Sequence, residues 1–302
     1  MPEALQYRVN ALNLNLRTTP EVKPETRLAV LSRGQIVSEI DAINGWLKVS
    51  TQLGGQTLTG FVARQFLVPL QEFEEPAEHH GLTEVHLSEN NPSVRRAVSS
   101  GRAFPIGEPD RPRRRAAGST SDKVTDLSSI IDWLDVEHSA RYQVTGSNTY
   151  CNIYAYDYCY LAAAYLPRVW WKPQAIVELR QGRPVKAEYD KTVVELNANG
   201  LFEWLAEFGD DFQWKRTFDL NELQESANAG AVGVICAQRA ELNRSGHISV
   251  VVPETQAHRA VRDGSTVIRP LQSQAGRANF KYSALHWWTQ AKFRQFGFWG
   301  HP

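Results

Sequence analysis

Cys151 and His247 are the two side chains whose surroundings in the sequence could support nucleophilic catalysis. A thiolate is stabilised at the N-terminus of a helix, where free backbone N–H groups and the helix dipole favour negative charge. Cys151 follows a loop-like stretch with capping residues, 146–149, and precedes a run, 152–165, that contains no Gly or Pro. His247 follows a glycine and opens a β-branched run, 248–252, which is typical of a strand. We therefore expect a thiol nucleophile on a helix and a histidine base on a strand.

Each step of amide hydrolysis has a candidate residue. Cys151 would attack the carbonyl carbon, and His247 would accept the thiol proton and later deliver a proton to the leaving amine. A third polar side chain should hold the imidazole in its useful tautomer. Two candidates follow the histidine strand: Gln274, on the next strand or turn, and Glu254, which requires the strand to end at Pro253.

Polar groups around the nucleophile would bind the oxyanion and the substrate. The Cys151 N–H would be one oxyanion donor, and an upstream polar residue would supply the second. The upstream candidates are Tyr142, Gln143 and Asn148. Asn152, directly after the nucleophile, is a further candidate for substrate contact, and Asp157 is expected to make a helix or substrate contact rather than to act as a base. Cys159 and Cys236 lie within apolar runs and are expected to be buried.

The composition excludes several other classes of function. Lys plus Arg and Asp plus Glu number 33 each in 302 residues, so no bulk charge points to a nucleic acid or an anionic membrane as partner. The three cysteines contain no C-x-x-C pair, and we expect free thiols with no metal and no cofactor. No apolar run approaches the roughly 18 residues of a spanning helix, so we expect no membrane insertion. The N-terminus lacks the features of a secretion signal, and we expect synthesis in the cytoplasm.

Short β-rich runs with frequent turn signals fill the first part of the chain, 7–70, and predict a small barrel. Four motifs occur there in order: LNLRTTP, LSRGQIV, NGWLKV and TGFVARQFL. They resemble the bacterial SH3-like (SH3b) family over nearly the whole segment. The resemblance implies a targeting domain, taken here as 1–75, that would hold the protein near a cell wall and so raise the local concentration of substrate.

The next segment, 76–121, is interpreted as a linker. Pro-rich stretches break any periodicity, and the basic run Arg111–Arg115 is followed by small polar residues. Such a run could contact an anionic wall polymer, but a solvated charge run is the preferred interpretation.

The remainder, 122–302, alternates helical and strand-like patterns, with helices first and strands afterwards. This order predicts an α+β domain with an antiparallel sheet. Besides the Cys151 helix, the expected helices are 127–136, 201–208 and 220–228, and the expected strands are 232–237, 247–252 and 266–270. Aromatic residues recur at helical spacing from His286 to Trp299, and we interpret them as part of the core because aromatic side chains in such a pattern are usually buried.

Five motifs between residues 142 and 279 carry a second resemblance: TYCNIYAYD, NANGLFEWL, ANAGAVGVICA, SGHISVVVPE and LQSQAG. They resemble the papain-like cell-wall hydrolases of the NlpC and CHAP superfamily, in particular members with a Cys-Asn nucleophile motif. The resemblance implies a papain-like fold that hydrolyses an amide bond of the wall peptide, as an endopeptidase or an N-acetylmuramoyl-L-alanine amidase. Because relatives place their orienting residue at the position of Gln274, it is preferred over Glu254. Tyr150 stands where the common Asp-Cys-Ser-Gly motif has Asp, so the resemblance does not determine which amide bond is cleaved.

The two resemblances together imply peptidoglycan or its peptides as partner. A wall-directed enzyme without a visible signal peptide would reach the wall or periplasm by a non-Sec route, as an antibacterial effector or a lysin would. A secretion apparatus or a cognate immunity protein would then be a further partner. The alternatives are a cysteine protease, deamidase or acyltransferase that acts on proteins, and an inactive wall-binding protein, against which the intact Cys151 and His247 argue.

Overall fold

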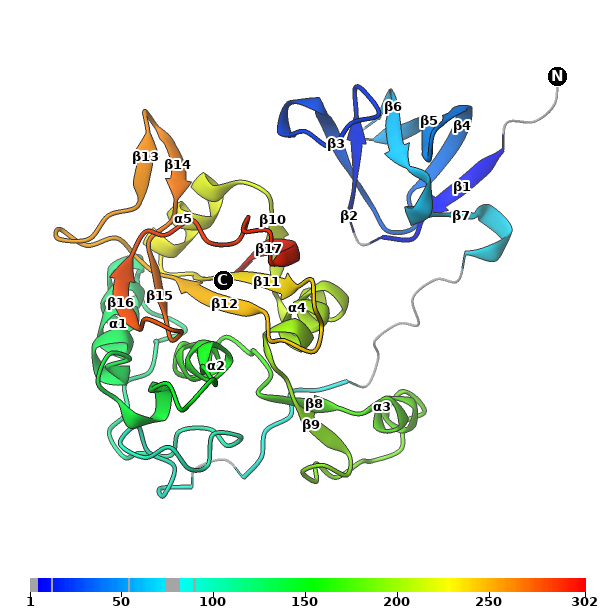
Figure 1. Ribbon diagram of the computed structural model, residues 1–302. Helices are drawn as coiled ribbons and strands as arrows, with labels where there is room; N and C mark the ends of the chain where they lie inside the picture. The colour runs from blue at the N-terminus through cyan, green and yellow to red at the C-terminus, as the bar shows by residue number, and fades with distance from the viewer. Residues whose placement is uncertain (1–4, 12, 54, 74–81, 89–90) are drawn as a thin grey trace. The chain divides into compact units, whose positions relative to one another are not determined.

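The computed structural model describes residues 5–11, 13–53, 55–73, 82–88 and 91–302, and the chain divides into two compact units, 1–79 and 80–302 (Figure 1). The first unit is built around an antiparallel sheet, and the second combines helices with another antiparallel sheet. The α+β arrangement expected from the sequence is confirmed.

The first unit is a curled half-barrel in which the strand order is β3–β2–β6–β5–β4–β1–β7. Neighbouring strands are antiparallel throughout. The strands are β1 (Gln6–Val9), β2 (Asn13–Arg17), β3 (Arg27–Ser32), β4 (Ile36–Ile43), β5 (Trp46–Leu53), β6 (Gln56–Ala63) and β7 (Leu67–Pro69), with 3-10 turns at Pro24–Thr26, Arg64–Phe66 and Leu70–Glu72.

The NGWLKV motif forms the tight hairpin between β4 and β5. Asn44 and Gly45 both have positive φ, 45° and 83°, and Ile43 pairs with Trp46 across a two-residue loop. Asn-Gly is the sequence favoured in such loops because both positions require φ above zero. Along β5 the side chains then alternate, with Leu47 and Val49 fully buried in the core of this unit.

The second unit is organised around a six-stranded antiparallel sheet in the order β10–β17–β11–β12–β15–β16. Its helices are α1 (Thr120–Leu134), α2 (Cys151–Leu161), α3 (Pro173–Arg180), α4 (Ala198–Glu207) and α5 (Leu220–Asn228), with 3-10 turns at Ala140–Tyr142 and Gly209–Phe212. The sheet strands are β10 (Lys215–Thr217), β11 (Val232–Arg239), β12 (His247–Val251), β15 (Gln272–Gln274), β16 (Phe280–Ser283) and β17 (Phe293–His301). Two smaller pairs are β8 (Val169–Trp171) with β9 (Val193–Glu195), and β13 (Val261–Asp263) with β14 (Thr266–Arg269).

Both faces of the central strand β11 are covered, which explains why its sequence is apolar throughout. Val234 and Cys236 pack in the larger core with residues of α2 and α4. The alternate residues Ile235 and Ala237 pack with α5 and with a group of aromatic side chains on the opposite face. The sheet is thus covered by α2 and α4 on one face and by α5 on the other, and α2 packs against β12 (Figure 1).

Residues 82–88 and 91–119 belong to the second unit, and their packing differs from the exposed connector that the sequence suggested. Ile106 is fully buried. Arg114, only 8% exposed, donates to the carbonyl oxygens of Gly230 at 2.7 Å and Pro302 at 2.8 Å. Arg115 pairs with Asp126 of α1 at 2.9 Å. The basic run is therefore tied to the fold, whereas residues 76–81 of the expected linker lie outside the described residues.

Other differences from the sequence expectations have local causes. Helix α1 begins at Thr120 rather than 127, because Ser119 and Asp122 form a capping box. The end of the aromatic run is the strand β17 rather than a helix, and its adjacent residues Phe298 and Trp299 are buried on opposite faces of the sheet. Strand β14 pairs with β13 and does not join the central sheet. Helix α5 has the predicted bounds.

Candidate active site

Cys151 is the first residue of α2, at an N-terminus that no side chain caps. The N-cap residue is Tyr150, with φ −123° and ψ 38°, and it makes no side-chain cap hydrogen bond. The capping role expected for 146–149 is thus not observed; Asn148 forms a backbone bridge with Thr145 instead. Backbone N–H groups of an uncapped first turn are available to an anion, which is the requirement for an oxyanion site.

The Cys151 thiol is almost completely buried, with 3% of the residue exposed. Burial raises the pKa of this thiol, and backbone N–H groups of Ile248, Asn152 and Cys151 itself partly offset the effect by favouring the thiolate. The contact with Ile248 is informative because Ile248 directly follows His247 in β12. The fold therefore brings the Cys151 sulfur to strand β12, where it contacts the residue that directly follows the predicted base His247.

His247 is held by Gln274. Its Nε2 lies 2.6 Å from Gln274 Oε1, and the amide NH₂ of Gln274 donates to the carbonyl oxygen of Ala278 at 3.2 Å. Because the amide nitrogen is used by Ala278, the oxygen must be the atom that faces the imidazole, so Nε2 carries the proton. Nδ1 is consequently the unprotonated nitrogen, which is the form that a general base requires.

A second contact fixes the helix of the nucleophile to the strand of the orienting residue. Tyr154, one turn after Cys151, makes a 2.6 Å hydroxyl–hydroxyl hydrogen bond with Ser273 of β15. Ser273 directly precedes Gln274. Contacts from α2 thus reach β12 at Ile248 and β15 at Ser273, the two strands that carry His247 and Gln274.

Trp287 covers the imidazole from one side. The two rings meet edge to face with centroids 4.4 Å apart, and the indole Nε1 donates to Gln272 Oε1 at 2.8 Å. Ser249 also donates to this oxygen at 2.8 Å, and Gln272 is fully buried. Trp287 is buried, as expected for a core residue, but no signal in the sequence indicated its contact with His247.

Burial lowers the pKa of His247 to about 4, an effect that the positive charge of Lys292 adds to and the Gln274 hydrogen bond opposes. Since burial also raises the pKa of Cys151, both groups are neutral at pH 7. Within the described residues no direct hydrogen bond joins the thiol to the imidazole. The neutral Cys151 thiol contacts the residue next to the neutral His247 imidazole, so nucleophilic attack by this thiol would require a proton transfer at the same time.

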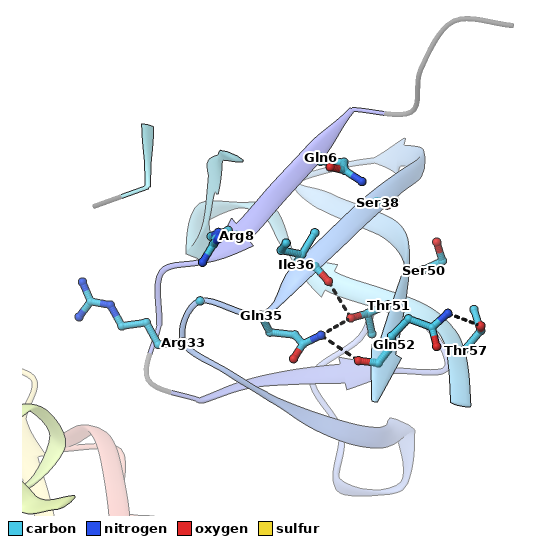
Figure 2. A pocket seen from close by; sticks show the side chains of 11 residues that line it. Gln6, Arg8, Arg33, Gln35, Ile36, Ser38, Ser50, Thr51, Gln52 and Thr57 are labelled. Carbon is cyan, nitrogen blue, oxygen red and sulfur yellow. Dashed lines mark hydrogen bonds between the residues drawn. The ribbon is translucent and has the colours of Figure 1, made fainter. Parts of the chain in front are cut away.

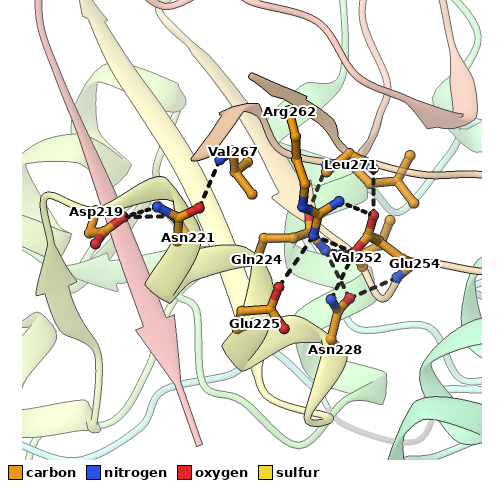
Figure 3. A network of polar contacts seen from close by, with 11 residues as sticks. Asp219, Asn221, Gln224, Glu225, Asn228, Val252, Glu254, Arg262, Val267 and Leu271 are labelled. Atoms are coloured by element: carbon orange, nitrogen blue, oxygen red, sulfur yellow. Dashed lines mark hydrogen bonds and ion pairs between the residues drawn. The ribbon is translucent and has the colours of Figure 1, made fainter. Parts of the chain in front are cut away.

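Glu254, the alternative orienting residue, belongs to a different polar network (Figure 3). Its carboxylate accepts from Arg262 Nη1 at 2.7 Å and Nη2 at 2.8 Å, and from Asn228 at 2.9 Å. These hydrogen bonds, chiefly those with Arg262, lower the pKa of Glu254 to about 2. The network joins α5 to the chain that follows β12, and the side chain that contacts His247 is Gln274.

Tyr142 is placed differently from the expectation that it binds the oxyanion or substrate, whereas Asp157 makes a structural contact of its helix, one of the two roles expected for it. Both are fully buried, and Tyr142 donates to Asp157 at 2.9 Å. Arg141, also fully buried, makes a two-pronged ion pair with Asp157 at 2.6 and 3.1 Å and donates to the Phe104 carbonyl oxygen at 2.9 Å. A carboxylate enclosed in this way ties α2 to 101–104 and presents no surface to a substrate.

The remaining candidates are distributed around the start of α2. Asn148 is exposed in the preceding loop. Gln143 donates to the carbonyl oxygen of Glu137 at 2.9 Å. Asn152 donates to the carbonyl oxygen of Leu196 at 2.9 Å, which fixes the first turn of α2 beside β9. Arg102, which the sequence analysis placed in a linker, lies 3.6 Å above the ring of Tyr150.

The first unit carries a separate polar pocket of about 760 Å³ (Figure 2). Gln35 donates to Thr51 Oγ1 and to the Gln52 carbonyl oxygen, both at 2.9 Å, so its amide is fixed in one orientation. Arg8 and Arg33 also line the pocket. A rigid amide and two guanidinium groups suit a polar ligand with carboxylate groups.

No group of three or more His, Cys, Asp or Glu side chains among the described residues is arranged to hold a metal ion. In the same part of the chain, every helix is too short or too polar to cross a bilayer. The sequence matches no protein-family model, and comparison with curated proteins finds no significant match.

Proposed function

We propose that this protein is a cysteine amidohydrolase that cleaves an amide bond of the peptidoglycan peptide. The observation that carries the chemistry is the position of Cys151 at an uncapped helix N-terminus, with its sulfur at the amide of Ile248 and His247 fixed by Gln274. A nucleophile, a base in a defined tautomer and an orienting amide are the parts that thiol hydrolysis needs.

The mechanism uses these groups in two stages. Sγ of Cys151 attacks the carbonyl carbon while its proton passes to Nδ1 of His247. N–H groups of the first turn of α2 bind the resulting oxyanion. The C–N bond then breaks, the amine leaves with the proton from Nδ1, and a thioester remains. A water molecule, deprotonated by His247, hydrolyses the thioester to a carboxylic acid and restores the thiol.

The choice of substrate rests on the resemblance of both units to wall-directed families. The SH3-like first unit would bind the wall and raise the local concentration of scissile bonds for the second. Its polar pocket with Arg8 and Arg33 is consistent with a peptide that carries free carboxylates.

Digestion of purified peptidoglycan tests this proposal. We expect the wild type to release fragments, and mass spectrometry of these fragments would distinguish endopeptidase from amidase cleavage. Cys151→Ala should abolish release, while the matched variant Cys159→Ala, which alters a fully buried thiol on the same helix, should remain active. Cys151-dependent cleavage, deamidation or acylation of proteins without any release from peptidoglycan would replace this function by a protein-modifying one.

A further inference from the structure

We propose that Asn199 is a positioning residue that holds the loop before His247 and thereby sets the place of the base. This inference rests on the proposed function for its catalytic meaning. The loop 240–246 connects β11 to β12, and residues 240–245 are exposed, so apolar packing does not hold them. Strand β12 begins with His247 directly after this loop, so a displacement of the loop moves the backbone of the histidine.

Asn199 lies in the first turn of α4 and is 6% exposed. Its Oδ1 accepts from the N–H of Arg239, the last residue of β11, at 2.9 Å. Its Nδ2 donates to the carbonyl oxygen of Arg244 at 2.8 Å and that of Leu242 at 3.4 Å. One buried carboxamide therefore joins the end of β11 to the far arm of the loop, using both its acceptor and its donor.

Gly246 shows how closely the loop and Asn199 approach. A Cβ atom at this position would lie 2.7 Å from Asn199 Oδ1 and 2.2 Å from the carbonyl oxygen of Ala237. Both distances are too short for a real Cβ, so only glycine fits. Since Ala237 is the register partner of His247, this close approach occurs at the residue pair that carries the base.

The first turn of α4 is attached to β11 through the backbone of Ala198, independently of its N-cap residue Asn197. Asn197 caps α4 by accepting from the N–H groups of Asn199 at 2.9 Å and Gly200 at 3.1 Å. The thiol of Cys236 in β11 lies 3.4 Å from the carbonyl oxygen of Ala198. The first turn of α4 is thus attached to β11, and Asn199 transmits that rigidity to the loop. Misplacement of a catalytic group by about 1 Å can cost about 100-fold in rate.

Two neighbouring asparagines provide a matched test in the full-length protein. Asn199→Ala should lower kcat on a soluble wall peptide by about 100-fold with KM little changed, because the base is displaced while the binding surface is retained. Asn197→Ala removes the helix cap and should lower the melting temperature while kcat is retained. Asn199→Asp keeps the volume and the acceptor for Arg239 but opposes the carbonyl oxygen of Arg244, and should behave like Asn199→Ala.

The pH dependence of Cys151 alkylation by iodoacetamide gives a readout that is independent of substrate. The pH profile of alkylation in the wild type should differ from the profile in His247→Ala. Both Asn199 variants should shift toward the His247→Ala profile, whereas Asn197→Ala should keep the wild-type profile. Wild-type profiles in both Asn199 variants, or equal losses in the Asn197 and Asn199 variants that follow melting temperature, would overturn the inference. Lack of Cys151-dependent peptide hydrolysis by the wild type would instead refute the proposed function, and the alkylation profiles would still decide the role of Asn199.

Discussion

The proposed mechanism starts from a neutral Cys151 thiol and a neutral His247 imidazole. Burial opposes charge on both groups, raising the pKa of the thiol and lowering that of the imidazole to about 4. The Gln274 amide has no charge with which to stabilise an imidazolium, although its oxygen accepts a hydrogen bond from Nε2–H whether His247 is neutral or charged. The helix N–H groups would favour negative charge once it develops, so the site supports the transition state more than a resting ion pair.

The pH dependence of hydrolysis should reflect the lowered pKa of His247. Because the base must be neutral, kcat/KM on a soluble substrate should be retained from pH 7 to about 5 and fall as pH approaches about 4. The linked contribution to stability has the same sign: it is full above the unfolded pKa of about 6.5 and is lost as pH falls through about 4. An acidic limb near pH 6.5 would instead indicate that His247 keeps the ordinary pKa of an imidazole and that its burial does not control the reaction.

Gln274 and Glu254 should have opposite effects when each is replaced by Ala. Gln274→Ala removes the acceptor that fixes Nε2–H, so turnover should fall by about two orders of magnitude or more as the tautomers mix. It should also move the acidic limb to lower pH, because this hydrogen bond raises the pKa of His247. Glu254→Ala should leave turnover nearly unchanged and lower the melting temperature, since it breaks the Arg262 network. The reverse ranking of turnover would assign the orienting role to Glu254.

Helix α2 presents the nucleophile at its N-terminus and is held by polar contacts on several of its turns. Tyr154 contacts β15, and Asp157 pairs with Arg141 and Tyr142. The ion pair has no exposed surface. Such a pair contributes little net stability compared with apolar residues, but the removal of one partner leaves an uncompensated buried charge. Its role is to set the position of the helix.

Asp157→Asn should therefore destabilise the protein by about 3–5 kcal/mol in urea unfolding, because the buried Arg141 loses its counter-charge. Asp210→Ala provides a control at an exposed ion pair, in which Lys215 lies 3.0 Å from Asp210, and should cost less than about 1 kcal/mol. A fully stable Asp157→Asn variant with reduced activity would show that Asp157 acts on the substrate after all.

The boundary between the two units lies before residue 82 and not after 121, because residues 82–88 and 91–119 belong to the second unit and contribute to its core. Val85, Leu87 and Ile106 are buried with the helices of that unit. Arg114 connects this segment to the end of the chain by its hydrogen bond to Pro302. The folding unit is thus larger than the region that carries the hydrolase motifs.

A shortened chain of residues 82–302 should fold and keep its rate on a soluble wall peptide, while losing rate on intact wall because the tether is removed. A chain of residues 125–302 should fail to fold, since it lacks the buried residues of 82–119 and the first residues of α1. Circular dichroism and melting would follow folding, and digestion of both substrates would follow activity. Equal losses on both substrates for 82–302 would mean that the first unit shapes the active site.

Local sequence was sufficient for those features that depend on near neighbours. The helix Leu220–Asn228 follows from periodicity and was predicted with these bounds. The Asn44-Gly45 hairpin follows from turn chemistry in the same local way. The helix position of Cys151 and the strand position of His247 were predicted for the same reason. The linker interpretation of 82–88 and 91–119 and the helical spacing of the aromatic run were wrong, because irregular segments and strands buried on both faces lack a periodic signal. The assignment of that aromatic run to the core is confirmed for Trp287, Trp288, Phe298 and Trp299.

The amino-acid pattern determined that this protein has an N-terminal β unit, an α+β unit, a cysteine at a helix start and a histidine at a strand start. Only the folded structure showed that Gln274, and not Glu254, contacts His247 and that Tyr142 is buried against Asp157. It also placed Trp287 against His247, and Asn199 against the loop that precedes His247. The reason is physical: a residue type and its neighbours define local conformation, whereas hydrogen bonds between residues 27 to 45 positions apart depend on which strands pair and which helices cover them.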